Sequence, residues 1–264
     1  PPTLSNVEVT VNGDTTVHTV GPDNALTPAL TANTTKTLTF KVTYKDIDQN
    51  NPNVPESDHY VRLEIDGMSP ITMKAQGNDY ANGVVYQAQV TGLTAGAKLF
   101  RIEAFDGPGA MGDTVTLPST GFISGISIWS VPELLPPSPN TPATNDGTCT
   151  PLSGIRSSIY QFRIIYKNAD GRAPQSIKLV LDPGASGERS IDLTPQGTAP
   201  INYVAGVTYG YDTTANELAV GSHTYRFEAT DGLTPVQTTT YSGPTVANAT
   251  LSLTAPTTGS LSPQ

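Results

Sequence analysis

The amino-acid sequence predicts an all-β protein built from two tandem antiparallel β-sandwiches. Three observations lead to this fold class. Apolar and polar residues alternate in many short segments, as they do in half-buried strands. The 24 glycines and 23 prolines of the 264-residue chain supply frequent turns, and no segment shows helical periodicity. In addition, one half of the chain repeats the other.

The repeat is visible in three blocks that occur twice in the same order. The blocks, each followed by its copy, are FKVTYKDID at 40–48 and FRIIYKNAD at 162–170, DYANGVVY at 79–86 and NYVAGVTY at 202–209, and LTAGAKLFRIEAFDG at 93–107 and LAVGSHTYRFEATDG at 218–232. The two copies of a block lie 122 to 125 residues apart. This nearly constant spacing indicates a tandem duplication with small insertions in the loops.

The strands of the first copy are located by their period-2 pattern. The predicted strands, in chain order, are 6–13, 36–45, 60–66, 84–90, 98–105 and 113–123. Within the second of these, Phe40 and Tyr44 lie on the apolar face and polar residues on the other. The second copy places Phe162 and Tyr166 in the same way.

The length of the repeat also sets the domain organisation. A unit of about 120 residues with six or seven short strands fits an immunoglobulin-like sandwich. We therefore expect a first sandwich over 1–128, a Pro-rich connector over 129–152, a second sandwich over 153–246, and a C-terminal strand or tail over 247–264. The connector is expected to be stiff, because proline restricts the backbone.

Three of these motifs also resemble a known group of proteins. The pattern F-x-V-x-Y-x-D at 40–46, followed by G-x-x-Y at 83–86 and YRFEATDG at 225–232, is similar to the tandem Ig-like repeats of bacterial and archaeal cell-surface proteins, relatives of PKD and cadherin-like modules. The resemblance covers 36–128 and 158–246. It implies a cell-surface, adhesive or structural role. Asn168 stands where the first copy has Asp46, and this departure weakens any inference about a metal.

Charge and composition exclude several kinds of partner. The net charge is −9 and Lys and Arg do not cluster, which argues against nucleic acid and anionic membranes as partners. No apolar run approaches the roughly 18 residues of a membrane-spanning helix. Two glycosylation sequons, at Asn33 and Asn248, favour an extracellular location. Cys149 is the only cysteine, so the chain has no internal disulfide.

Carboxylates at the predicted loop ends are the candidate metal ligands. Asp46 and Asp48 follow one strand and Asp106 follows another, and these two loops emerge at the same end of an Ig-like sandwich. The corresponding residues of the second copy are Asn168, Asp170 and Asp231. Ca²⁺ prefers such oxygen ligands, but it takes about six of them. Asp-Gly after a strand is also ordinary turn chemistry, so both interpretations stay open.

Arg101 and Glu103, and likewise Arg226 and Glu228, are predicted to face outward on their strands. The plain interpretation is a set of ion pairs on one face, contributing less than about 1 kcal/mol each. The alternative is a Lys–Asn cross-link promoted by the glutamate. That chemistry needs a carboxyl group buried in apolar surroundings, which an outward glutamate beside an arginine does not provide.

The sequence gives no sign of an enzyme or of a cofactor. His18, His59 and His223 lie in unrelated contexts without metal-ligand spacing. No nucleophile elbow, phosphate-binding loop or dinucleotide motif is present. Cys149 has no nearby histidine, so we expect an inert or intermolecular thiol.

Both chain ends have the alternation of strands, at 6–13 and 246–256. One interpretation is that a terminal strand docks on the open sheet edge of another copy, which would give a head-to-tail extracellular fibre or surface layer. The other is that 246–264 begins a third repeat, so that the chain is an Ig-like spacer or ligand-binding segment of a large adhesin or secreted carbohydrate-active protein. Trp129 is expected either to cap the first sandwich or to enter a neighbour. Surface glycans or other cells are further possible partners.

Overall fold

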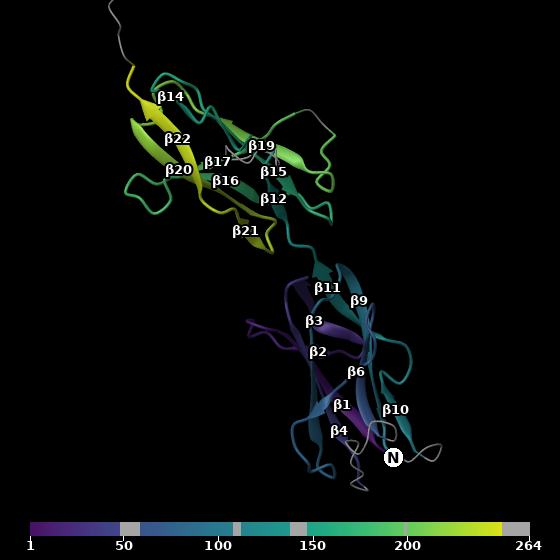
Figure 1. Ribbon diagram of the computed structural model, residues 1–264. Helices are drawn as coiled ribbons and strands as arrows, with labels where there is room; N and C mark the ends of the chain where they lie inside the picture. The colour runs from purple at the N-terminus through teal and green to yellow at the C-terminus, as the bar shows by residue number, and fades with distance from the viewer. Residues whose placement is uncertain (48–58, 108–111, 138–146, 198–199, 250–264) are drawn as a thin grey trace, which may run out of the picture. The chain divides into compact units, whose positions relative to one another are not determined.

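The computed structural model describes residues 1–47, 59–107, 112–137, 147–197 and 200–249, and it confirms the all-β fold class. The described residues contain no α-helix. The chain forms two compact units, each a β-sandwich (Figure 1). The first unit comprises Pro1–Val131 together with Asn168–Asp170, and the second comprises Pro132–Lys167 and Gly171–Gln264.

The first sandwich has eleven strands in its described residues. They are β1 (Thr3–Val11), β2 (His18–Val20), β3 (Ala25–Asn33), β4 (Leu38–Lys45), β5 (Tyr60–Ile65), β6 (Ile71–Thr72), β7 (Lys74–Ala75), β8 (Val84–Val90), β9 (Gly96–Phe105), β10 (Thr114–Leu117) and β11 (Ile123–Trp129). One layer has the order β7-β8-β4-β1-β2, and the other has the order β6-β5-β9-β11 with β10 beside β9. β3 pairs antiparallel with β2 and parallel with β11, so it joins the two layers.

The second sandwich also has two layers, which here are two separate sheets. Its strands are β12 (Glu133–Leu135), β13 (Cys149–Thr150), β14 (Ser153–Ile155), β15 (Gln161–Lys167), β16 (Ser176–Leu181), β17 (Arg189–Asp192), β18 (Thr194–Pro195), β19 (Val207–Asp212), β20 (Gly221–Thr230), β21 (Pro235–Gln237) and β22 (Tyr241–Ala247). One layer has the order β12-β15-β19-β18 with β13 beside β15. The other has the order β14-β22-β20-β16-β17 with β21 beside β20, and β14 runs parallel to β22.

Each sandwich has its own hydrophobic core, and the two cores are built alike. In the first, Phe40 of β4 meets Phe100 of β9 edge-to-face, with ring centroids 5.1 Å apart. In the second, Phe162 of β15 meets Tyr225 of β20 in the same way at 5.0 Å. Such aromatic pairs contribute about 0.5–1.5 kcal/mol beyond their buried area. The equivalent pairs show that the sequence repeat is a repeat of packing.

The N-terminal strand belongs to the first sandwich itself. β1 pairs antiparallel with β4 from Thr3, opposite Lys45, to Val11, opposite Leu38. Its alternate residues Val7 and Val9 are buried in the core. The first strand of this sandwich is therefore supplied by its own chain.

The strands that end the two layers of the first sandwich are very short. β6 and β7 have two residues each, and between them the buried Met73 turns into the core. In the second sandwich β18, which corresponds to β7, also has two residues, whereas β17, which corresponds to β6, has four. Short edge strands offer few unpaired backbone groups to another chain.

Two predicted segments differ from the structure. The strand expected over 113–123 is divided into β10 and β11, because Pro118 lacks an N–H and the turn after it shifts the chain along β9. The connector expected over 129–152 contains β12 and β13, both paired with β15. Its prolines flank these edge strands, a position that proline tolerates. Of the predicted C-terminal strand or tail at 247–264, residues 250–264 lie outside the described part of the chain.

In the part of the chain that the structure describes, no helix has the length and apolarity needed to cross a bilayer.

Candidate functional site

Two of the predicted carboxylates lie near the Tyr44 hydroxyl at one end of the first sandwich. Asp46 directly follows β4 and Asp106 directly follows β9, and both are almost fully buried. Burial, followed by the charges of these two carboxylates, raises the pKa of the Tyr44 hydroxyl. One oxygen of Asp106 accepts a hydrogen bond from the backbone N–H of Asp113 at 2.9 Å. Asp48 lies outside the described residues.

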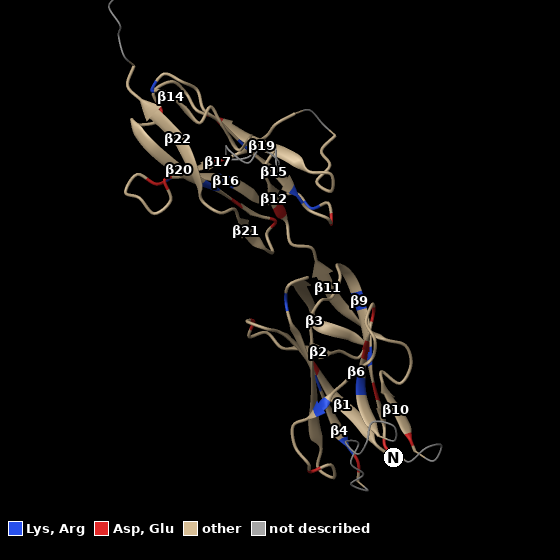
Figure 2. Cartoon of the chain, in the orientation of Figure 1, with Lys and Arg blue, Asp and Glu red and all other residues tan. Residues whose placement is uncertain are grey.

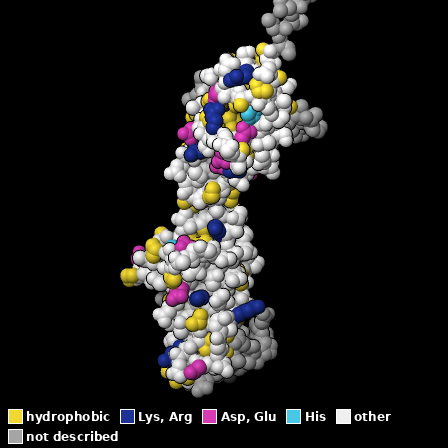
Figure 3. All heavy atoms as spheres, turned by 90° about the vertical axis from the view of Figure 1, so that its left-hand side faces the viewer, with side chains coloured by type: hydrophobic (Ala, Val, Ile, Leu, Met, Phe, Trp, Pro, Cys, Tyr) yellow, Lys and Arg dark blue, Asp and Glu magenta, His cyan; other side chains and the backbone are white. Residues whose placement is uncertain are grey.

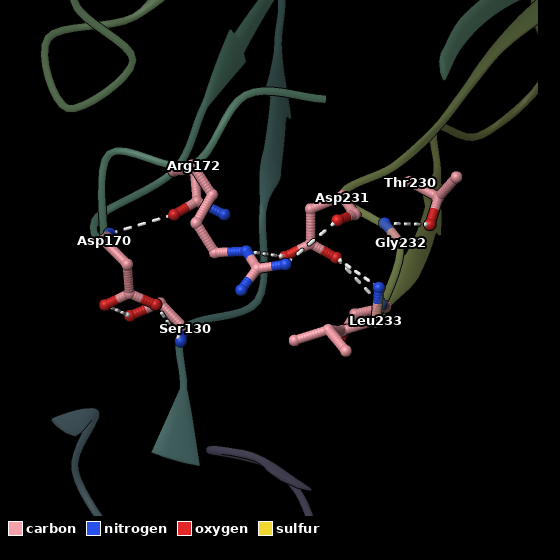
Figure 4. Close-up of polar contacts among 9 residues, drawn as sticks. Ser130, Asp170, Arg172, Thr230, Asp231, Gly232 and Leu233 are labelled. Carbon is pink, nitrogen blue, oxygen red and sulfur yellow. Dashed lines mark hydrogen bonds and ion pairs between the residues drawn. The ribbon is translucent and has the colours of Figure 1, made fainter. Parts of the chain in front are cut away.

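The corresponding positions of the second repeat are arranged differently. Asn168 replaces Asp46, and its side-chain oxygen accepts a hydrogen bond from the N–H of Asp170. The carboxylate of Asp231 is buried and lies 3.5 Å from Nε of Arg172, which also donates to the Asp231 carbonyl oxygen (Figure 4). Backbone N–H groups after Asp231 donate to the same carboxylate. The second repeat thus has one buried carboxylate and a guanidinium where the first has two carboxylates.

Asp170 itself does not join Asp231. Its carboxylate accepts hydrogen bonds from the backbone N–H and the hydroxyl of Ser130, which follows β11 (Figure 4). The sequence grouped Asp170 with the candidate metal ligands, but both oxygens of its carboxylate accept hydrogen bonds from Ser130 instead.

The described residues offer few ligands for the predicted calcium site. Among the residues that the structure describes, no group of three or more His, Cys, Asp or Glu side chains could hold a metal ion. Asp46 and Asp106 supply two carboxylates, whereas Ca²⁺ takes six to eight oxygen ligands. In the second repeat Arg172 supplies positive charge to Asp231 from within the chain. We therefore assign no metal site from these residues.

A network of ion pairs covers the outer face of β5 and β9. Arg101 contacts Glu64 and Arg62 contacts Glu103, each at 2.7 Å. Tyr60 also donates to Glu103, and the Arg62 guanidinium lies 4.4 Å from the Tyr60 ring centre. Glu103, predicted to face outward, is nearly buried at 8% exposure, and its carboxylate accepts hydrogen bonds from Tyr60 and Arg62.

The pairing on this face was predicted only in part. In the first sandwich Arg101 and Glu103 bond across strands, whereas in the second Arg226 and Glu228 bond to each other within β20 at 2.6 Å. Figure 2 shows positive and negative residues interspersed along both units. Partly exposed pairs such as Arg226 and Glu228 contribute little to stability, and they make the face polar.

The remaining reactive side chains are separated from one another. Cys149 is buried in the second core, and burial raises the pKa of its thiol to about 12. At neutral pH the thiol is protonated, so its nucleophilicity is suppressed. His18 contacts the carbonyl of Pro28, while His223 contacts Asp182 and Ala219.

The sequons and Trp129 lie at strand ends. Asn33 ends β3, and its side-chain oxygen accepts hydrogen bonds from the N–H and hydroxyl of Thr35. Asn248 is exposed just after β22. Trp129 is half-buried and ends β11 opposite Asn33, so it lies at the end of the first sandwich.

Apolar side chains on the surface do not gather into one large patch on the face drawn in Figure 3. An open groove on the outer face of the second sandwich is lined by polar and apolar residues, among them Lys178, Glu228 and Val236. It has the mixed character of an ordinary sheet surface.

The chain was compared with known families, curated proteins and solved structures. No family model matches it, and no curated protein matches it. Among solved structures, the C-terminal domain of the Streptococcus agalactiae AgI/II polypeptide BspA is 9% identical, with a TM-score of 0.32, over 93% of this chain and 100% of that one. A second structure of that domain is 8% identical, with a TM-score of 0.33, over 90% of this chain and 99% of that one.

A pullulanase from Anoxybacillus sp. LM18-11, solved with maltotriose, is 11% identical with a TM-score of 0.25. The match covers 81% of this chain, which spans about a quarter (27%) of the pullulanase chain. At such low TM-scores these similarities do not bear on the function of this chain. What its own structure establishes is a tandem pair of Ig-like β-sandwiches.

Proposed function

We propose that this chain is a non-enzymatic structural segment of an extracellular surface protein, in which two sandwiches act as a spacer. The observation that carries the proposal is that each sandwich is completed by its own chain. β1 pairs with β4 in the first unit, β12 and β13 pair with β15 in the second, and each unit has a separate core. A self-contained module that is duplicated in tandem adds length without needing a partner.

The path of the chain through each sandwich supports a spacer. In the first, Thr3 lies beside Lys45 at the end of β4, whereas Trp129 pairs with Asn33, close to the start of β4. The chain therefore enters this sandwich at one end and leaves it at the other, as Figure 1 shows for the N-terminus and β11.

The second sandwich has the same path. Glu133 pairs with Lys167 at the end of β15, whereas Ala247 pairs with Ile155, upstream of β15. In this sandwich too, the chain therefore enters at one end and leaves at the other.

An extracellular setting is supported by the sequons and by the chemistry of the single cysteine. Asn33 and the exposed Asn248 lie at strand ends, where a glycan would not displace core residues. The one cysteine is buried and protonated, so the fold needs neither a disulfide nor a reducing compartment.

The more specific form of the proposal is a fibre or surface layer assembled by donation of a terminal strand to the next copy. The N-terminal strand is already paired within its own sandwich, so the donor in this form would be the C-terminal segment 247–264. The edge strands are short: β6, β7 and β18 have two residues each, β12 and β14 have three, and β17 has four, so they leave little backbone for it to pair with. The geometry therefore favours the spacer over the fibre.

Sedimentation velocity and negative-stain electron microscopy of the full chain at increasing concentration separate these forms. A spacer remains a monomer, and removal of 250–264 does not change its sedimentation. Filaments that disappear when 250–264 is removed would overturn the spacer and establish strand donation.

A further inference from the structure

His223 is a nearly buried histidine whose two ring nitrogens both contact hydrogen-bond acceptors. It lies on β20 and is 9% exposed. Nδ1 is 2.7 Å from a carboxylate oxygen of Asp182, which directly follows β16. Nε2 is 2.9 Å from the carbonyl oxygen of Ala219, in the loop before β20. The imidazole thus connects three segments of the second sandwich.

These contacts determine the protonation state that satisfies the site. A backbone carbonyl and a carboxylate oxygen only accept hydrogen bonds, whereas a neutral imidazole has one N–H and one bare nitrogen. Both contacts are hydrogen bonds only when the ring carries two protons and a positive charge. Loss of one proton would set a bare nitrogen against an acceptor oxygen.

The first sandwich has a lysine at the same position. Lys98 aligns with His223 in the sequence repeat, is also almost buried, and donates to the hydroxyl of Thr94, four residues earlier, at 2.9 Å. Ala219 likewise lies four residues before His223. The two repeats therefore share a basic side chain that reaches back to the same loop, and in the second repeat that side chain is an imidazole.

The aspartate beside this position is also shared. Asp66 follows β5 and accepts a hydrogen bond from the N–H of Leu99, and Asp182 follows β16 and accepts one from the N–H of Thr224. Each aspartate therefore fastens the end of one strand to its neighbour. In the second sandwich the same carboxylate also holds the histidine.

The other charged groups near this loop are engaged with each other. Glu217 lies in the loop that supplies Ala219, and it accepts hydrogen bonds from Arg189 of β17 and from Tyr211 of β19. Among the described residues, Asp182 is the charged group that contacts His223.

We propose that the contact of His223 with Asp182 and Ala219 is a titratable clamp, which makes the second sandwich lose stability as the medium becomes alkaline. The inference does not depend on the spacer function, because it concerns the folding of one unit.

The direction of the effect follows from the balance of forces on the ring. Burial by itself lowers the pKa of His223, but the hydrogen bonds to Ala219 and Asp182 and the charge of Asp182 outweigh it, so the pKa lies above its ordinary value. A raised pKa in the folded state means that the stabilisation is fully present below the unfolded value near 6.5 and is lost as the pH rises through the folded value.

The test uses the full chain and the two reporters that it already contains. Trp129 lies in the first sandwich and Cys149 in the core of the second, so urea unfolding of each unit can be followed by fluorescence and by brief thiol labelling. Between about pH 5.5 and pH 9, the unfolding constant of the second unit should rise about tenfold for each unit by which the pKa of His223 is raised. The His223→Lys variant, which copies the first sandwich, should lose that rise.

Nuclear magnetic resonance of the His223 ring supplies a readout that a purely structural role would not change. The Asp182→Asn variant keeps an oxygen for the N–H of Thr224, and it should lower the pKa of His223 while the protein stays folded. A pKa of His223 at or below 6.5 in the wild type, or one that Asp182→Asn leaves unchanged, would overturn the proposal. So would a pH dependence of the second unit that persists in His223→Lys.

Discussion

Arg172 and Asp231 show how the two repeats of one chain differ at equivalent positions. The first repeat buries Asp46 and Asp106 beside a tyrosine hydroxyl. The second replaces the former with Asn168 and brings a guanidinium to the remaining carboxylate. A buried carboxylate is costly unless hydrogen bonds or an opposite charge compensate it. The second repeat provides both from its own residues.

Replacing Arg172 by Met should therefore destabilise the second sandwich by about 1–3 kcal/mol, because the Asp231 carboxylate loses its positive partner while staying buried. Arg172→Lys is the matched control, since it keeps the charge and should recover part of the loss. Urea unfolding followed by Cys149 labelling measures the effect in this unit. Equal stability of Arg172→Met and the wild type would mean that the backbone N–H groups satisfy Asp231 without the arginine.

At the scale of elements, the N-terminal strand β1 lies inside a layer and not at its edge. It inserts between β4 and β2, and its buried valines complete one layer of the first core. Burial of a valine side chain contributes about 1.5–3 kcal/mol. Together, Val7, Val9 and Val11 therefore contribute an amount comparable to much of the net stability of a small domain. β1 is therefore an integral part of the first sandwich.

The Val9→Asp variant should unfold the first sandwich or detach β1, because residue 9 is fully buried and a carboxylate there has no partner. Thr10→Asp, one residue later on the half-buried outer face, should change stability by less than about 1 kcal/mol. Trp129 fluorescence during urea unfolding reports on this unit. The hypothesis that β1 is integral fails if both variants behave alike.

The sequence predicted the central strands well and the peripheral ones less well. The segments 36–45, 60–66, 84–90 and 98–105 coincide with β4, β5, β8 and β9 to within two residues at each end, because their alternation is uninterrupted. β12 and β13 were not predicted, because they are only three and two residues long and lie near prolines, where the composition indicates a connector.

For the polar residues, the sequence predicted which positions are equivalent but not which contacts they make. The repeat alignment already paired Lys98 with His223 and Asp46 with Asn168. It did not show what these side chains contact. Asp182, which contacts His223, and its counterpart Asp66 are 116 residues apart and lie outside the aligned blocks, so the alignment did not match them. Arg172 likewise lies just beyond a block. Contacts made by loop residues depend on the path of the loop, which periodicity does not encode.

At the scale of the whole molecule, the two units have separate cores and should unfold separately. Small single domains usually unfold in one cooperative step, so a chain with two such cores should show two transitions. The change in Trp129 fluorescence should follow one transition and the exposure of Cys149 the other. A single transition seen identically by both reporters in wild type and in Arg172→Met would show instead that the units unfold together.

The placement of the first and last strands has a mechanical consequence. Tension applied to the two ends of either sandwich pulls its terminal strands lengthwise, since the chain enters and leaves at opposite ends. The ladder that joins β3 to β11, and the one that joins β14 to β22, then carry the load on all of their bonds simultaneously, whereas a hairpin pulled open from one end would yield them one after another. Each sandwich should therefore resist stretching most strongly along its own strands.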